Sequence, residues 1–377
     1  MVNLIISNVR TKPSFGGEEL ITKLLVEKLS NDYNISYLGY PFDIVAQHSI
    51  FPFSRFLPRL KGIGILLRKI RILKYIFVKR LNLKCDLFIS NSNSDDLAVF
   101  RGYKQNIFYD KIIVIKHGPN FEFGKIYPDP LIKNRKFKIL VLNSTDLKEL
   151  SSKYGNENVE LLHLGINVDT KNNFSDVSYL KSLGITDESK VIFSIGRLEE
   201  KQKGFLSGIL AIKEIIDKTK NKEHFVYLIA GSGKDGKLYQ KVISKYNLQN
   251  SVKLLGRISD NIKHQIYVRA DFVLQPSVSE SFSSVALEAL KYGKILLVSK
   301  NKGSIDIIKN SGSNQNAFFI ERDPKQIADL LISILANFTD SDLNLIKDNA
   351  MKTGDMFTED KMLIQIKEVI NKMVNNE

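Results

Sequence analysis

Residues 275–293 read QPSVSESFSSVALEALKYG, and this stretch decides the interpretation of the chain. The preceding residues 271–274, DFVL, form a short apolar run that is typical of a buried strand, and Pro276 ends it. Ser283 and Ser284 stand just before VALEAL, a strong helix former, where hydroxyl groups cap the free backbone N–H groups of a first turn. The sequence therefore predicts a helix that begins in the loop after a parallel strand.

Two glutamates, Glu280 and Glu288, stand on either side of the start of this helix. Glu280 falls in the loop and Glu288 lies one turn inside the helix, so both carboxylates can reach one ligand from different sides. A helix N-terminus offers N–H donors and a partial positive charge to an anion such as phosphate. The residues alone fit two interpretations: a ligand site of this kind, or an ordinary strand–helix unit with two solvated glutamates.

A basic loop follows an earlier strand. Residues 191–205, VIFSIGRLEEKQKGF, predict a β-branched strand, a glycine turn and then the loop, which carries Arg197 and Lys203. The forked guanidinium of arginine and the point charge of lysine both suit a diphosphate. Taken alone, the same pair also fits solvated surface charge.

Two glycine-rich stretches also follow strands. Gly16 and Gly17 begin an amphipathic helix after the strand VNLIIS, and such glycines let a backbone approach a ligand closely. Residues 230–237, AGSGKDGK, contain a literal G-x-G-x-x-G, which is the pattern of a dinucleotide-binding turn. That interpretation is disfavoured, because the strand is the second of its domain and no acidic strand end follows at the required spacing.

Taken in order, PS, E, F, LEAL and the following Gly resemble the Glu-x7-Glu region of retaining glycosyltransferases of family 4. Arg197 and Lys203 resemble the diphosphate-binding pair of that family, and the AGSGKDGK loop resembles its I-x-G-x-G element beside the nucleotide. The loop at Gly16 and Gly17 resembles its glycine-rich loop, which faces the donor phosphates and the acceptor. His117, at the end of IIVIKHG, resembles its cleft histidine near the donor sugar, although a lone histidine there also fits a structural role.

The resemblance implies transfer of a sugar from a nucleotide diphosphate sugar to a hydroxyl group, with retention at the anomeric carbon. Glu288 would hold the ribose hydroxyls and Glu280 the donor sugar, with neither acting as a covalent nucleophile. The implied catalytic residues are Glu280, His117, Arg197 and Lys203. The implied donor-binding residues are Gly16, Gly17, Arg197, Lys203, Gly231, Gly233, Ile258, Phe282, Ser283, Ser284 and Glu288.

The expected donor is a UDP-sugar, with GDP- and ADP-sugars as alternatives. No Asp-x-Asp motif for a divalent ion is visible, so neither a metal ion nor another cofactor is expected. The base would be met by backbone atoms around residues 231–233 and 256–258. The acceptor would be a glycan or glycolipid, such as a lipid-linked or polysaccharide intermediate.

Strand and helix signals alternate along the 377 residues, which favours parallel α/β sheets and leaves room for two full cores. We predict the GT-B fold: two Rossmann-like domains facing across a cleft, with a C-terminal helix crossing back to the N-terminal domain. The predicted parts are 1–170, a linker 171–188, a nucleotide-sugar domain 189–355, and the final helix 356–377. The predicted strands are 2–6, 35–39, 86–89, 112–115, 138–142 and 159–162 in the first half, and 190–195, 225–230, 251–255, 271–274, 295–298 and 317–320 in the second.

Composition narrows the cellular setting. Cys85 is the single cysteine, which leaves no disulfide framework and fits a reducing cytosol. VNLIIS is too short for a secretory signal, and no uncharged apolar run approaches the length of a membrane span. We therefore expect a cytoplasmic protein.

The net charge of +14 is concentrated in residues 55–84, which hold ten Lys and Arg and no acidic residue. This segment fits either a core helix with a basic solvated face or attachment to an anionic membrane surface, at the inner face of which the protein would be peripheral. A nucleic-acid partner is not expected, because no recognition helix, zinc pattern or RNA-binding motif is present. Two other classes of function stay open: another enzyme of the same fold, such as a sugar-nucleotide epimerase or a phosphorylase, and a non-catalytic partner subunit that binds a nucleotide sugar.

Overall fold

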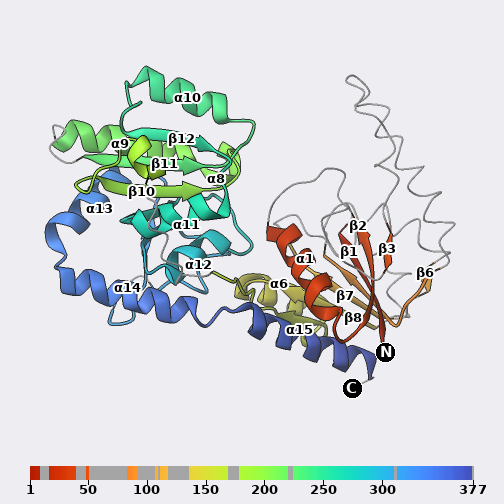
Figure 1. The fold of residues 1–377 in the computed structure, drawn as a ribbon. Helices are drawn as coiled ribbons and strands as arrows, with labels where there is room; N and C mark the ends of the chain where they lie inside the picture. The colour runs from red at the N-terminus through yellow and green to blue at the C-terminus, as the bar shows by residue number, and fades with distance from the viewer. Residues whose placement is uncertain are drawn as a thin grey trace, which may run out of the picture. The chain divides into compact units, whose positions relative to one another are not determined.

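The structure is a computed structural model, and the described residues form two compact units (Figure 1). Met1–His163 with Asp360–Glu377 make the first, and Leu164–Glu359 make the second. The described residues are 1–8, 17–39, 48–50, 83–91, 107–108, 111–117, 136–168, 178–219, 224–309 and 312–375. Gly16, most of the basic segment and part of the predicted linker lie outside them.

Within the described residues, the first unit contains a parallel sheet of seven strands in the order β3-β2-β1-β5-β7-β8-β9. The strands are β1 (Asn3–Asn8), β2 (Asn34–Gly39), β3 (His48–Ile50), β5 (Leu87–Ser90), β7 (Lys111–Ile115), β8 (Lys136–Val141) and β9 (Val159–Leu161). β5 and β7 are apolar on both faces because the helices of a parallel sheet cover both sides. The short β4 (Leu83–Lys84) pairs with β6 (Ile107–Phe108) in a separate ladder.

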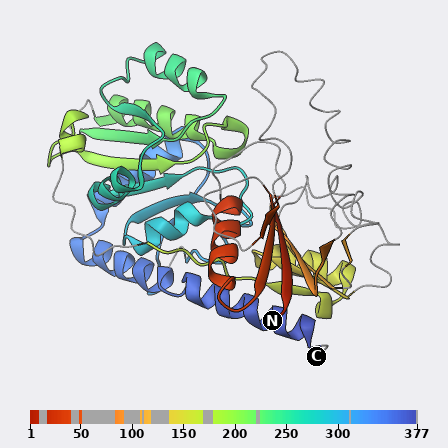
Figure 2. The ribbon, with the colours of Figure 1, turned by 45° about the vertical axis from the view of Figure 1, so that its right-hand side comes forward.

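Among the described residues of the first unit, two helices follow strands of this sheet, and a third comes from the end of the chain. α1 (Gly17–Leu29) and α6 (Ser144–Tyr154) come after β1 and β8, and a 3-10 turn, η2 (Asn156–Asn158), leads into β9. α15 (Glu359–Val374) is the C-terminal helix, and it packs on the first unit as predicted (Figure 2).

α15 runs past the amino-terminal ends of the first unit's strands. Its Lys367 pairs with Asp32, just before β2, at 2.5 Å between Nζ and Oδ2. Lys111, the first residue of β7, donates from Nζ to the carbonyl oxygen of Val374 at 2.8 Å. α15 therefore contacts the sheet at its amino-terminal edge, opposite the carboxyl-terminal edge at which the predicted site residue His117 lies.

The second unit contains a parallel sheet of six strands in the order β12-β11-β10-β13-β14-β15. The strands are β10 (Lys190–Ile195), β11 (Phe225–Ala230), β12 (Val252–Gly256), β13 (Phe272–Gln275), β14 (Ile295–Ser299) and β15 (Phe318–Ile320). This is the Rossmann strand order, in which the direction of winding reverses between the first and fourth strands, here β10 and β13. Each predicted strand of both halves is present, with small shifts at the ends.

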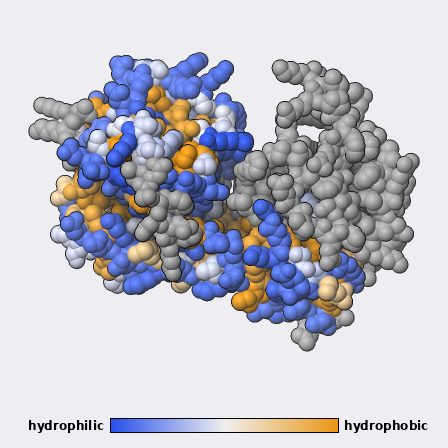
Figure 3. Space-filling view, viewed as in Figure 1, coloured by the Kyte–Doolittle hydropathy of each residue, from blue (hydrophilic) through white to orange (hydrophobic). Residues whose placement is uncertain are grey.

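Helices cover both faces of the second sheet (Figures 1 and 2). They are α7 (Ser178–Ser182), α8 (Glu200–Lys203), α9 (Phe205–Thr219), α10 (Gly236–Lys245), α11 (Asp260–Arg269), α12 (Ser284–Lys291), α13 (Pro324–Asn337) and α14 (Asp340–Gly354). Two apolar clusters result, one containing α9, α10 and α13 and the other α11 and α12. On the face drawn in Figure 3, hydrophilic residues cover most of this unit.

Two stretches of chain at the ends of the second unit lie against each other. The Ile166 N–H donates to the Phe357 carbonyl at 3.3 Å, and Lys291 Nζ donates to the Ile166 carbonyl at 3.0 Å. At Gly165 a Cβ atom would lie 2.0 Å from the Thr358 carbonyl oxygen, so only glycine fits there. None of the helices in the described part of the chain is long and apolar enough to cross a bilayer.

Candidate active site

The predicted residues of the second unit lie at the carboxyl-terminal edge of its sheet. Arg197 and Lys203 follow β10, and Glu280 follows β13. These are the two strands between which the strand order reverses, and ligands of open α/β sheets bind at such a switch point. The topology thus brings together two loops that are far apart in the sequence.

Backbone contacts hold these two loops together. The Val278 N–H donates to the Gln202 carbonyl at 2.8 Å. Gly204 ends the single turn α8 in the left-handed conformation, with φ of 65°, and a Cβ there would lie 2.5 Å from the Pro276 carbonyl oxygen. Glycine at this position therefore permits both the turn and the close approach of the loops.

Lys203 and Glu280 form an ion pair, with Nζ and Oε1 2.5 Å apart. Their side chains are only 15% and 12% exposed, so solvent screens this pair far less than a surface pair. The loop after β14 packs on the same segment, since a Cβ at Gly303 would lie 2.9 Å from the Glu280 Cβ. Lys203 and Glu280 are therefore held in fixed positions at the switch point.

Arg197 has a different partner. Its Nη1 lies 3.6 Å from Oε2 of Glu199, and its side chain is 53% exposed. Lys234 donates to the other oxygen of Glu199 at 2.7 Å, and this hydrogen bond is the main cause of the lowered pKa of Glu199. The structure thus places Arg197 on the same loop as Lys203 with its guanidinium accessible to solvent.

The N-terminus of α12 has a buried cap. The Ser283 hydroxyl accepts from the Ala286 N–H at 3.2 Å and donates to Oε1 of Gln275 at 2.7 Å. Because both functions of this buried hydroxyl are used within the protein, Ser283 orients the helix. Phe282 precedes the cap and lies 6.3 Å from Phe357 between ring centroids, and Ser284 is the first helical residue.

Glu288 lies on α12 with its Oε1 3.3 Å from Nζ of Lys263, which belongs to α11. The sequence prediction included Glu288 but not Lys263. The pKa of the buried Tyr267 is raised, first by burial and then by the Glu288 carboxylate. The sequence gives little indication of Lys263. Its contact with Glu288 depends on how α11 and α12, which come before and after β13 in the chain, pack together.

The glycines of the AGSGKDGK loop serve close backbone packing. Gly231 has φ of 134°, and a Cβ there would lie 1.8 Å from the Gly196 carbonyl oxygen. A Cβ at Gly233 would lie 2.3 Å from the Leu198 carbonyl oxygen. The loops after β10 and β11 therefore touch through their backbones. Ile258, after β12, packs against the apolar cluster that contains α11 and α12.

In the first unit, His117 follows β7 at the carboxyl-terminal edge. It is buried, and its Nε2 lies 2.6 Å from Oδ1 of Asn91, which follows β5. Asn91 and Asn8, the last residue of β1, both donate to the Thr22 hydroxyl, at 2.7 and 2.6 Å. The sequence prediction included His117 but neither of the two asparagines. Gly17 is the first residue of α1.

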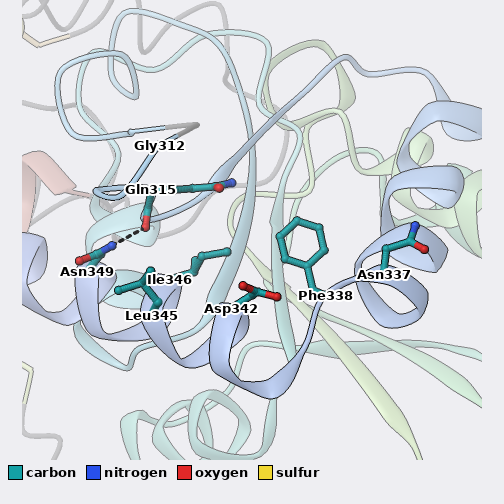
Figure 4. Close-up of a pocket in the computed structure, with 8 residues that line it drawn as sticks. All are labelled: Gly312, Gln315, Asn337, Phe338, Asp342, Leu345, Ile346 and Asn349. Carbon is teal, nitrogen blue, oxygen red and sulfur yellow. Dashed lines mark hydrogen bonds between the residues drawn. The ribbon is translucent and has the colours of Figure 1, made fainter.

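A separate pocket of about 230 Å³ lies beside the loop before β15 and the helices α13 and α14 (Figure 4). Its lining residues are Gly312, Gln315, Asn337, Phe338, Asp342, Leu345, Ile346 and Asn349. Because this loop precedes its strand, the pocket lies at the amino-terminal edge of the sheet, away from Lys203 and Glu280. Asn349 Nδ2 already donates to the carbonyl groups of Ser313 and Gln315, at 2.9 and 3.0 Å.

The described residues contain no group of three or more His, Cys, Asp or Glu side chains placed to hold a metal ion.

The protein is thus an α/β protein of two units, with paired lysine, arginine and glutamate side chains at the switch point of its second sheet. Residues 178–352 match the family model described as Glycosyl transferases group 1. This range includes each predicted site residue of the second unit. The second unit therefore carries a glycosyl transferases group 1 domain, and the predicted assignment to glycosyltransferases is confirmed at the level of this domain.

Among curated proteins, the chain is 33% identical over 134 residues to an uncharacterized glycosyltransferase of Methanocaldococcus jannaschii. This match covers 36% of the chain and 33% of the relative, so the chain spans about a third of that protein's length.

Solved structures match over the whole chain. Sucrose-phosphate synthase from Thermosynechococcus elongatus has a TM-score of 0.74 at 15% identity and covers 100% of both chains. Anabaena HepE in complex with UDP-glucose has a TM-score of 0.72 at 16% identity, covering 99% of this chain and 100% of that one. At these identities the likeness shows the fold, and it confirms the predicted GT-B class of two Rossmann-like domains.

Proposed function

We propose that this protein transfers a sugar from a UDP-sugar to a hydroxyl acceptor with retention at the anomeric carbon. The observation that carries the proposal is the Lys203–Glu280 pair, which lies at the switch point of a sheet in a glycosyl transferases group 1 domain. The choice of UDP over GDP or ADP is supported by the whole-chain likeness to HepE, which was solved with UDP-glucose.

The reaction breaks the bond between the sugar C1 and the diphosphate oxygen and forms a bond from C1 to the acceptor oxygen on the same face. The acceptor's proton passes to an oxygen of the leaving phosphate. Lys203, Arg197 and the free N–H groups of the first turn of α12 stabilise the negative charge that develops on the diphosphate. An ammonium group has three donors, so Lys203 can keep its bond to Glu280 while it donates to a phosphate oxygen.

The other predicted residues receive binding roles. Glu280 accepts from hydroxyls of the donor sugar, and Glu288 accepts from the ribose hydroxyls. Backbone atoms at Gly231, Gly233 and Ile258 meet the nucleotide. The roles of His117, Gly16 and Gly17 near the donor stay predictions from the sequence, and Gly16 lies outside the described residues.

The charge of the diphosphate is balanced by protein cations in this mechanism, so no divalent ion takes part. Transfer should therefore persist after dialysis against EDTA, with activity compared before and after addition of Mg²⁺ or Mn²⁺. Loss of transfer in EDTA and its recovery with a metal ion would remove this part of the proposal.

The acceptor in this proposal is a lipid-linked or polysaccharide intermediate at the inner face of a membrane, met by a cytoplasmic enzyme. The support is the basic composition of residues 55–84. Sedimentation with vesicles containing 30% anionic lipid, at low and high salt, tests it. Binding that salt abolishes is expected, and equal binding to neutral vesicles contradicts the role of charge.

The donor site is tested by calorimetric titration with UDP. Lys203→Met should weaken UDP binding by about tenfold to a hundredfold, because a hydrogen bond to a charged group contributes roughly 1.5–3 kcal/mol. Lys201→Met is the matched control, since Lys201 lies on the same turn and is exposed. Equal affinity in the two variants would show that Lys203 does not meet the diphosphate.

Turnover separates the proposed activity from its rivals. A transferase releases UDP from UDP-glucose only when an acceptor is added, here an extract of lipid-linked glycans. An epimerase would change the sugar without an acceptor, and a non-catalytic partner would bind UDP without releasing it from the sugar nucleotide.

A further inference from the structure

Lys263 contacts Glu288, although Lys263 belongs to no recognisable sequence motif. It belongs to the first turns of α11, which begins at the Ser259 cap just after the loop at residues 256–258. α11 precedes β13 and α12 follows it, so the two helices bring Lys263 and Glu288 together. Their Nζ and Oε1 atoms are 3.3 Å apart, and the side chains are 27% and 19% exposed.

Aromatic side chains pack closely beside the Lys263–Glu288 pair. The Tyr267 ring is fully buried and stacks on Tyr292, with centroids 4.8 Å apart and planes at 6°. The hydroxyl of Tyr292 lies 2.7 Å from Nδ1 of His264. His264 directly follows Lys263 and Tyr267 lies one turn further along α11, so these contacts fix the part of the helix that presents the ammonium group.

Lys263 has a second acidic neighbour that differs in burial. Asp260 Oδ1 is 3.5 Å from Nζ, but the Asp260 side chain is fully exposed, so water competes for this contact. The Glu288 side chain is only 19% exposed, so solvent screens its contact with Lys263 far less. The geometry therefore indicates that the contact with Glu288, rather than the contact with Asp260, is the stronger one.

We infer that Lys263 is a positioning residue that orients the Glu288 carboxylate to accept from the ribose hydroxyls of the donor nucleotide. This inference rests on the proposed function, in which Glu288 meets the ribose. A carboxylate only accepts hydrogen bonds, so it should bind a nucleotide that carries both ribose hydroxyl donors more tightly than one that lacks them. Lys263 would thus set the preference of the site for a ribonucleotide.

The test compares the binding of UDP with that of its 2′,3′-dideoxy analogue by calorimetric titration on the full chain. In the wild type, UDP should bind at least tenfold more tightly. Lys263→Met should lower UDP affinity by about tenfold and leave the affinity for the analogue nearly unchanged, so the preference falls. Lys263→Arg should restore most of the preference because it restores the cation.

Two further variants separate positioning from general stability. Asp260→Asn should keep the full preference, since it removes only the exposed neighbour. Glu288→Gln should lose the preference, and adding Lys263→Met to it should cause no further loss. A Lys263→Met protein with a lower unfolding temperature but an unchanged preference would reduce Lys263 to a structural role and overturn the inference.

The same titrations distinguish failure of the inference from failure of the function. If the wild type binds neither nucleotide, the proposed function itself is wrong. If the wild type binds both equally, Glu288 does not meet the ribose, and the inference falls while a UDP site remains. If UDP is preferred and Lys263→Met preserves that preference, only the role of Lys263 is rejected.

Discussion

Single glycines decide how closely the loops around the candidate site can pack. At Gly231 a methyl group would lie 1.8 Å from the Gly196 carbonyl oxygen, and the backbone φ is 134°. Gly231→Ala should therefore destabilise the protein by roughly 2–4 kcal/mol, through a steric clash with backbone in addition to strain. Urea unfolding measures this change.

The control for that prediction is Gly256, at the end of the next strand. It also has a positive φ, of 68°, but no atom lies within 4 Å of an added Cβ. Gly256→Ala should cost only the strain of the left-handed conformation, about 1–2 kcal/mol. If the two variants are equally stable, close backbone packing is not what requires Gly231.

Lys294, just before β14, predicts a pH effect. Burial lowers its pKa from 10.5 to about 8, and its Nζ donates to the Val268 carbonyl at 2.8 Å. Because the folded pKa lies below the unfolded one, the unfolded state binds more protons between pH 8 and 10.5, and stability rises with pH across that window. At pH 7 the charged lysine destabilises the fold.

Lys294→Met should therefore be more stable than the wild type at pH 7, by roughly 1–3 kcal/mol. The difference should shrink towards pH 10, where the wild-type lysine becomes neutral in the folded state. Urea unfolding of both proteins at several pH values checks this, and a difference that is constant with pH would show that Lys294 does not titrate in the window.

At this scale the sequence predicted the residues that belong to contiguous motifs. Arg197, Lys203 and Glu280 each stand in a short pattern of turn and helix signals, which local chemistry makes visible. Lys263 and Asn91 do not, because their partners come from other elements that the sheet topology brings near. The roles of the predicted residues stay predictions until binding is measured.

At the scale of elements, a buried ion pair joins the end of β7 to the start of α6. Lys116 Nζ and Asp146 Oδ2 are 2.5 Å apart, and the side chains are 5% and 3% exposed. Asn143, the cap of α6, also donates to Asp146 at 2.9 Å. Lys116→Met should cost about 3–5 kcal/mol, because it leaves a buried carboxylate without its cation.

The double variant Lys116→Met with Asp146→Leu should recover much of that loss, since no buried charge remains. Lys213 and Asp217 on α9 form a matched surface pair, also 2.5 Å apart but with side chains 33% and 57% exposed. Lys213→Met should leave the denaturation midpoint nearly unchanged. Equal losses at the two sites would contradict the argument that burial, and not distance, decides the cost.

Strands that carry a continuous apolar run were predictable because parallel sheets bury both faces of such runs. The strands β3, β4 and β6 were missed, and each is only two or three residues long, too short for any periodicity to show. The sequence analysis separated the G-x-G-x-x-G stretch from a dinucleotide turn by its place in the domain, and the stretch does follow β11, the second strand of its unit. The close packing of its glycines against the neighbouring loop could be seen only in the structure.

At the scale of the whole molecule, the two sheets share one winding pattern. Both reverse their strand order after the first strand and its two neighbours on one side, between β1 and β5 in one unit and between β10 and β13 in the other. Polar residues gather at both reversals: Asn8 and Asn91 at the first, Lys203 and Glu280 at the second. The repeated topology therefore accounts for a polar cluster in each unit.

α15 belongs to the first unit rather than the second. This division predicts which properties of the protein a substitution on α15 should change. Ile366 on α15 is 1% exposed, whereas Ile364 on the same helix is 57% exposed. Ile366→Ala should destabilise the protein by about 2–5 kcal/mol through the cavity it leaves, and Ile364→Ala should change stability by no more than about 0.5 kcal/mol. Because Arg197, Lys203 and Glu288, which are proposed to bind the diphosphate and the ribose, belong to the second unit, both variants should bind UDP with nearly wild-type affinity below their unfolding temperatures. Calorimetric unfolding and UDP titration on the same samples test both statements, and weaker UDP binding by Ile366→Ala alone would show that the donor site depends on the packing of α15.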